Sequence, residues 1–151
     1  MPGVVIIRSV MSNYPYSIEL SAHANSAKTM LQQMKIHHLP VMENGSPVGI
    51  VTTRDIDKAK YLGLDVSIGS KALVRDIYTP SPHIVTPDES LEKVLRDMAE
   101  QHIDAAIVLE NDKLVGIFTA TDACLRYADL LKHSPEAIEN HNNEIDRDFL
   151  G

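Results

Sequence analysis

The hydrophobic positions of this 151-residue chain alternate between a helical and a strand-like spacing. Leu91, Val94, Leu95 and Met98 fall on one face of a helix, and Asp88 and Ser90 before them offer N-cap oxygens. Two short apolar runs follow at 106–109 and 114–118, separated by an Asn-Asp turn signal. A run at 84–86 precedes the helix, and a further helix opens at 119–122. The pattern predicts strand, helix, β-hairpin and helix.

The first half of the chain shows the same order of patterns. Ala27, Met30, Leu31 and Met34 form a helical apolar stripe. Residues 39–42 and 48–51 read as a hairpin joined through Asn44-Gly45, and a helix begins near 52–55. Pro40 and Pro47 fit strand starts or edges better than a central strand, because proline has no N–H to donate.

The two halves are copies of one unit. The segment Gly-Ile-Val-Thr-Thr-Arg-Asp at 49–55 recurs as Gly-Ile-Phe-Thr-Ala-Thr-Asp at 116–122, 67 positions later. The register holds upstream, where 41–44 matches 108–111 and 8–10 matches 75–77. A single duplication of this length predicts a pseudo-symmetric pair rather than a solenoid. We expect repeat 1 with its connector at 4–70, repeat 2 at 71–132 and an acidic tail at 133–151.

Composition narrows the range of functions. The formal net charge is −7, which argues against a nucleic-acid binder that relies on a basic surface. Aromatic residues make up 5% and there is no Trp, so broad stacking surfaces for single strands are not expected. The chain has one cysteine and no apolar run long enough to span a membrane. We therefore expect a cytoplasmic protein that acts without membrane or nucleic acid.

The order of these motifs, including Leu-Pro-Val at 39–41 and Val-Gly-Ile-Val-Thr-x-x-Asp at 48–55, resembles the CBS domain, named after cystathionine β-synthase. The resemblance covers about residues 4–132. It implies an α+β fold in which two βαββα repeats pack with pseudo-two-fold symmetry. It also implies two clefts at the joint that often bind AMP, ADP, ATP or S-adenosylmethionine. The implied role is regulation of an unknown protein target, in a homodimer of such pairs, rather than catalysis.

The repeated Thr-x-x-Asp places Thr52 and Asp55, and Thr119 and Asp122, at strand-to-helix junctions. Unpaired N–H groups and the helix dipole favour anions there, and a carboxylate can accept both ribose hydroxyls. In the CBS family this Asp holds the ribose, which the resemblance carries to Asp55 and Asp122. The alternative is ordinary N-capping, for which Thr followed by Asp in the first turn is equally suited.

His37 and His38 precede the Leu-Pro-Val strand, and imidazoles donate to phosphate. By resemblance to the regulatory subunit of AMP-activated protein kinase, this place reaches nucleotide phosphates. Repeat 2 has Asp104 there instead, so we expect the Asp55 cleft to be the better phosphate site and Asp104 to disfavour phosphate in the Asp122 cleft. Arg54 would contact phosphate as well, although it and the two histidines could equally be solvated surface groups.

The remaining contacts are assigned from the opposite repeat. For the Asp55 cleft we expect the adenine to lie against Thr79, His83, Ile84 and Ala105. For the Asp122 cleft the matching positions include Ser12, Tyr16, Ser17 and His37. Repeat 1 departs from the family pattern at 18–23, which weakens the assignment of the second cleft.

No catalytic or metal-binding constellation stands out in the sequence. The main hypothesis is a ligand sensor that requires no cofactor and binds an adenosine compound between the repeats. The alternative is a ligand-free dimeric interaction scaffold in which the Thr-x-x-Asp residues only cap helices.

Overall fold

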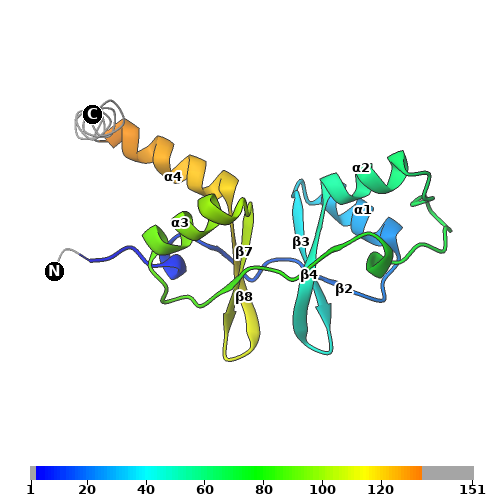
Figure 1. Ribbon diagram of the computed structural model, residues 1–151, viewed down its shortest axis with the longest axis horizontal. Coiled ribbons are helices and arrows are strands. Elements are labelled where there is room, and N and C mark those ends of the chain that lie inside the picture. The colour runs from blue at the N-terminus through cyan, green and yellow to red at the C-terminus, as the bar shows by residue number, and fades with distance from the viewer. Residues whose placement is uncertain (1–2, 134–151) are drawn as a thin grey trace. The chain divides into compact units, whose positions relative to one another are not determined.

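The computed structural model describes residues 3–133, and the chain divides into two compact units, Met1–Phe118 and Thr119–Gly151. The first unit holds two four-stranded sheets (Figure 1). In repeat 1 the elements are a 3-10 turn (Ile7–Ser9), β1 (Ser12–Asn13), β2 (Ile18–Glu19), α1 (Ala24–Gln33), β3 (His38–Glu43), β4 (Ser46–Thr52) and α2 (Thr53–Tyr61). In repeat 2 they are a 3-10 turn (Val74–Asp76), β5 (Thr79–Pro80), β6 (Ile84–Val85), α3 (Leu91–Gln101), β7 (Ala105–Glu110), β8 (Lys113–Thr119) and α4 (Ala120–His133). The predicted strand, helix, hairpin and helix are confirmed in both copies. The tail predicted at 133–151 lies, from residue 134 on, outside the described residues.

The helices form where the apolar stripes predict them. Ala27 and Leu31 of α1 are buried, and so are Val94 and Met98 of α3. The backbone N–H of Lys93 donates to Ser90 Oγ at 3.3 Å, so Ser90 is the N-cap of α3. The last residue of the predicted apolar stripe in α1 is not buried. Met34 is 41% exposed because the helix ends there.

Both hairpins turn at the predicted positions. Asn44 and Gly45 have φ values of +51° and +79°, and Asn111 and Asp112 have +52° and +62°. Two consecutive left-handed residues match the twist of the flanking strands, and Asn, Asp and Gly adopt that conformation most readily. The turn chemistry thus fixes the register of β3 against β4 and of β7 against β8.

Pro40 lies inside a central strand, which the sequence did not predict. The strand order is β2-β3-β4-β5, and Pro40 is fully buried opposite Ile50 of β4. Proline is tolerated because β2 pairs only with Val41 and Met42, so no strand on that side requires a donor from residue 40.

The two repeats exchange their leading segments. In the other sheet the order is β1-β8-β7-β6, so β1 of repeat 1 completes the sheet of repeat 2, and β5 of repeat 2 completes the sheet of repeat 1. The 3-10 turns that precede β1 and β5 also bind to the opposite repeat. Ile7 N–H donates to the Glu89 carbonyl at 3.0 Å, and Val74 N–H donates to the Ala22 carbonyl at 2.8 Å. Each repeat therefore needs the other for a complete sheet.

The repeated glycines Gly49 and Gly116 lie beneath these exchanged segments. A Cβ on Gly49 would lie 2.6 Å from Tyr78 Cδ2 and closer still to the Thr79 carbonyl oxygen. A Cβ on Gly116 would meet the side chain of Met11 instead, 3.0 Å from Cγ and closer still to Sδ. The duplicated glycine thus permits a close approach of backbone or side chain at equivalent places.

Apolar side chains join the two sheets of the first unit. Ile50 of β4 packs in one cluster with Ala105 and Ile107 of β7, and Leu109 and Leu114 flank it. The larger core of repeat 1 includes Ala72 and Val74 from the crossing segment of repeat 2. Ile50 and Ala105 of this joint between β4 and β7 also line the candidate site.

Candidate functional site

Thr52 and Asp55 form a reciprocal capping box at the junction of β4 and α2. Asp55 N–H donates to Thr52 Oγ1 at 3.1 Å, and Thr52 N–H donates to Asp55 Oδ2 at 2.9 Å. The Thr52 hydroxyl also donates to Asp55 Oδ2 at 3.1 Å. The capping interpretation is therefore confirmed, and it fixes the position of the carboxylate rather than excluding a second role.

The Asp55 carboxylate also reaches the exchanged strand. Thr79 Oγ1 donates to Asp55 Oδ1 at 3.0 Å, and Thr79 lies on β5 opposite Ile50 of β4. A carboxylate offers about four lone-pair positions, so Oδ1 keeps one acceptor position beside the Thr79 hydroxyl. Asp55 thus ties the start of α2 to repeat 2 and retains capacity for a further donor.

Thr119 and Asp122 repeat the capping box in the second unit. Thr119 N–H donates to Asp122 Oδ2 at 2.9 Å, and Asp122 N–H donates to Thr119 Oγ1 at 3.3 Å. The cleft predicted there would combine these two residues with Ser12 and Ser17 of the first unit. That cleft stays a prediction.

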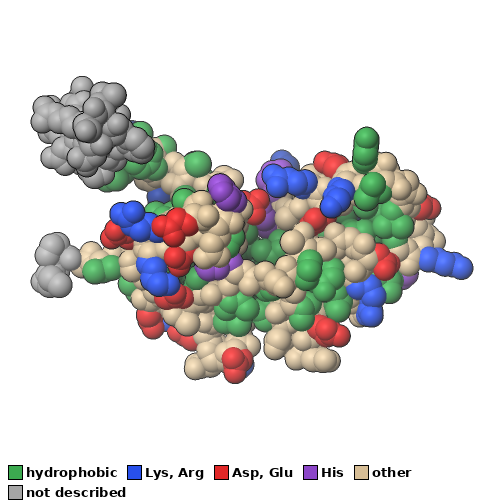
Figure 2. Space-filling view, in the orientation of Figure 1, with side chains coloured by type: hydrophobic (Ala, Val, Ile, Leu, Met, Phe, Trp, Pro, Cys, Tyr) green, Lys and Arg blue, Asp and Glu red, His purple; other side chains and the backbone are tan. Residues whose placement is uncertain are grey.

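A cavity of about 430 Å³ adjoins Asp55 in the first unit. Among the predicted site residues it is lined by Thr52, Arg54, Asp55, Thr79, His83 and Ala105. The sequence missed a second group of lining residues, namely Ile50, Pro80, Ser81, Pro82, Gln101, His102, Ile103 and Asp104. Histidine side chains gather around the hollow (Figure 2). The volume lies in the range of small-molecule pockets.

His83 lines the cavity and carries a buried polar atom without a partner in its side chain. Its Nε2 is buried and has no hydrogen-bond partner among the described residues, while its carbonyl accepts from Ile107 N–H at 2.8 Å. A buried nitrogen without a partner is unfavourable, so a turn of the His83 ring that offers this atom to a ligand in the adjoining cavity would be favourable. Ile84, the next residue, lies on β6, is 45% exposed, and is not part of the lining.

His38 and Asp104 line a smaller hollow next to this cavity. The hollow has a volume of about 210 Å³ and shares Thr52, Arg54 and Asp104 with the larger cavity. His38 Nε2 lies 3.4 Å from Asp104 Oδ2, and the two side chains are 17% and 57% exposed. Asp104, which the sequence placed in the Asp122 cleft, lines the cavity of Asp55. Asp104 directly precedes Ala105, and the start of β7 carries both into the cavity of Asp55.

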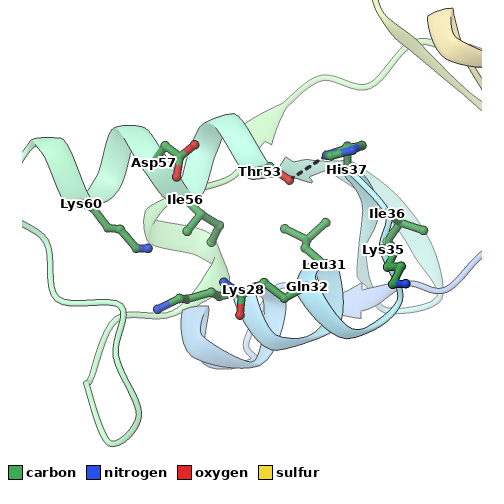
Figure 3. Close-up of a pocket in the computed structure, with 10 residues that line it drawn as sticks. All are labelled: Lys28, Leu31, Gln32, Lys35, Ile36, His37, Thr53, Ile56, Asp57 and Lys60. Carbon is green, nitrogen blue, oxygen red and sulfur yellow. Dashed lines mark hydrogen bonds between the residues drawn. The ribbon is translucent and has the colours of Figure 1, made fainter.

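His37 does not line the 430 Å³ cavity, and it contacts Thr53 at the start of α2. Its Nδ1 lies 3.3 Å from Thr53 Oγ1, and its carbonyl accepts from Thr53 N–H at 3.2 Å. Both residues line the small hollow and also a cavity of about 350 Å³ between α1 and α2. Lys28 and Lys60 extend towards that second cavity from the two helices (Figure 3). His37 therefore stands in the wall between two hollows rather than in the lining of the 430 Å³ cavity.

Within residues 3–133, no group of three or more His, Cys, Asp or Glu side chains could hold a metal ion. In the same part of the chain, no helix has the length and apolar character needed to cross a membrane.

Comparison with known proteins assigns both repeats to one family. A family model described as the CBS domain matches residues 7–61 and 74–129. The chain is 34% identical over 122 residues to an inosine-5′-monophosphate dehydrogenase from Thermoplasma acidophilum. The matched region covers 81% of this chain and 22% of that protein. The chain spans about a fifth of the length of the first curated relatives that it matches, 22% in two cases.

Two similar solved structures are CBS proteins with bound adenosine compounds. One is the CBS domain pair of protein MJ0100 in complex with 5′-methylthioadenosine and S-adenosyl-L-methionine. It has a TM-score of 0.72 and 25% identity, and the match covers 84% of this chain and 98% of that chain. The other is CBSX2 in complex with AMP, with a TM-score of 0.69, 26% identity, and coverage of 84% and 98%. The α+β pair of repeats is thus shared with these structures.

Proposed function

Because this chain belongs to the CBS domain family, we propose that it is a regulatory module that binds an adenosine-containing small molecule in the cavity beside Asp55. The observation that carries this proposal is that one cavity is lined by Asp55 and by His83, whose buried Nε2 has no partner among the described residues. One residue supplies a fixed acceptor and the other a polar atom without a partner. Such convergent polar groups in a pocket of this size suit a small polar ligand.

The ligand would be held from both repeats. The ribose hydroxyls would donate to Asp55, whose position the capping box fixes. The adenine would lie against Ala105 and offer a partner to His83 Nε2. The bound adenosine compounds of MJ0100 and CBSX2 support this ligand class, which includes AMP, ADP, ATP and S-adenosylmethionine.

A ligand in this cavity would link α2 of repeat 1 to the strands of repeat 2. It can shift a conformational equilibrium by no more than its difference in affinity between two states. We propose that a homodimer or a protein partner senses this shift, and that the module acts in the cytoplasm and is not itself an enzyme.

The test is thermal unfolding with adenosine, AMP, ADP, ATP, S-adenosylmethionine and 5′-methylthioadenosine. A ligand at ~100 times its dissociation constant stabilises the folded state by about 2.7 kcal/mol, which shifts the midpoint by several degrees. We expect at least one compound to raise the midpoint of wild type and to lose this effect in Asp55→Asn.

Asp76→Asn is the matched control. Asp76 Oδ2 accepts from Leu73 N–H at 2.8 Å, so it also caps a helical turn, but it lies outside the lining of the 430 Å³ cavity. Both variants replace a charged capping acceptor by a neutral amide oxygen, whereas only Asp55→Asn should lose the response to ligand. No shift with any compound in wild type, or equal shifts in both variants, would contradict the proposed function.

A ligand-free interaction scaffold is the second candidate. It is favoured by the three hydrogen bonds that the Asp55 carboxylate already accepts from Thr52 and Thr79. In that case Asp55→Asn lowers the stability only through a weakened capping box, and no adenosine compound changes the midpoint of wild type.

A further inference from the structure

The small hollow beside the Asp55 cavity has a mixed electrostatic character. The N-terminus of α2 at Thr52 and Thr53 and the Arg54 side chain favour an anion there. The Asp104 carboxylate lines the same hollow, and its negative charge disfavours an anion there. His38, 3.4 Å from Asp104, neutralises that carboxylate only when its imidazole is protonated.

The hollow is where the 5′ substituent of an adenosine compound would lie. Asp55 and Thr52 line the larger cavity, and Thr52, Arg54 and Asp104 also line the smaller hollow. With the ribose at Asp55 and the base towards His83, the 5′ group would extend towards Arg54 and Asp104, which line both the cavity and the hollow. A phosphate placed there would meet a carboxylate that comes from the opposite repeat.

We propose that Asp104 determines the specificity of this site, selecting adenosine compounds with an uncharged or cationic 5′ substituent over those with a 5′ phosphate. This inference rests on the proposed function. It reverses the expectation from the sequence, which made the Asp55 cleft the phosphate site on the strength of His37 and His38. The reversal follows from the position of Asp104, whose side chain is 57% exposed and therefore accessible to a ligand.

Isothermal titration of wild type and Asp104→Asn with 5′-methylthioadenosine, S-adenosylmethionine, AMP and ADP tests this inference. Wild type is expected to bind 5′-methylthioadenosine at least tenfold more tightly than AMP. In Asp104→Asn that ratio should fall at least fivefold, chiefly because AMP binds more tightly. Asp112→Asn removes the same charge from the β7–β8 turn, outside the cavity lining, and should keep the wild-type ratio.

A second variant tests the role of His38 beside Asp104. His38→Gln removes the imidazole that lies 3.4 Å from the Asp104 carboxylate and that neutralises it when protonated, so AMP should bind more weakly than to wild type. Wild type that prefers AMP over 5′-methylthioadenosine, or Asp104→Asn with an unchanged ratio, would overturn the inference while leaving the proposed function intact. If no adenosine compound binds wild type, the proposed function itself fails, and the inference fails with it.

Discussion

Replacing Gly49 by alanine tests whether the exchanged strand is needed for both the fold and the site. The new methyl group would lie 2.6 Å from Tyr78 Cδ2 and closer to the Thr79 carbonyl oxygen, which is backbone and cannot rotate away. β5 must therefore move off β4, and the hydrogen bond from Thr79 to Asp55 is strained or lost. Overpacking of this kind costs about 1–3 kcal/mol and the hydrogen bond about 1 kcal/mol, so we expect a loss of roughly 2–4 kcal/mol.

Gly116→Ala is the internal control for this prediction. Its methyl group would meet the side chain of Met11, which is unbranched and can change rotamer, so we expect a loss of about 1 kcal/mol or less. Urea unfolding followed by far-UV circular dichroism measures both variants, and thermal unfolding should show a decrease of roughly 5–15 °C for Gly49→Ala. Equal destabilisation of the two variants, or a Gly49→Ala variant as stable as wild type, would refute the reasoning.

Three further substitutions test the cavity wall, the helix cap and the core. His83→Phe keeps a ring but removes the unpaired Nε2, so the stability should be unchanged or higher while calorimetric titration shows weaker adenosine binding. A lower stability of His83→Phe together with unchanged adenosine binding would contradict this prediction. Thr52→Ala removes the N-cap of α2 and should lower the free energy of unfolding by about 0.5–2 kcal/mol in urea titrations. Leu39→Ala empties a fully buried position of β3 and should cost about 2–5 kcal/mol by the same measurement; a cost under about 1 kcal/mol would show that this core is not closely packed.

Much of the fold could be predicted because its signals are local. The stripes of α1 and α3, the Asn-Gly and Asn-Asp turns and the two capping boxes each depend on a few neighbouring residues. The exchange of β1 and β5 left no such signal, because each is only two residues long and pairs across the repeats. Pro40 misled the prediction for the same reason, since its place in a central strand is tolerated only through the short β2.

The candidate site, like the fold, could be predicted only in part. Thr52, Asp55, Thr79, His83 and Ala105 were predicted and lie in the lining of one cavity. The sequence did not predict the lining residues that adjoin these along the chain, namely Pro80 to Pro82 and Gln101 to Asp104.

Asp104 could have been found from its neighbour. Ala105 was assigned to the Asp55 cleft, and the adjacent carboxylate belongs with it. In the alignment of the two repeats, Asp104 is equivalent to His37. The structure brings Asp104 next to His38 instead, because the two repeats meet at the starts of β3 and β7.

The most direct test of the central claim is a crystal structure of the chain with the adenosine compound that gives the largest thermal shift. We predict the ribose hydroxyls on Asp55, the base against Ala105 with a polar atom at His83 Nε2, and the 5′ group beside Arg54 and Asp104. A ligand bound elsewhere, for example in the cavity between α1 and α2, or a 430 Å³ cavity left empty at saturating ligand, would contradict it.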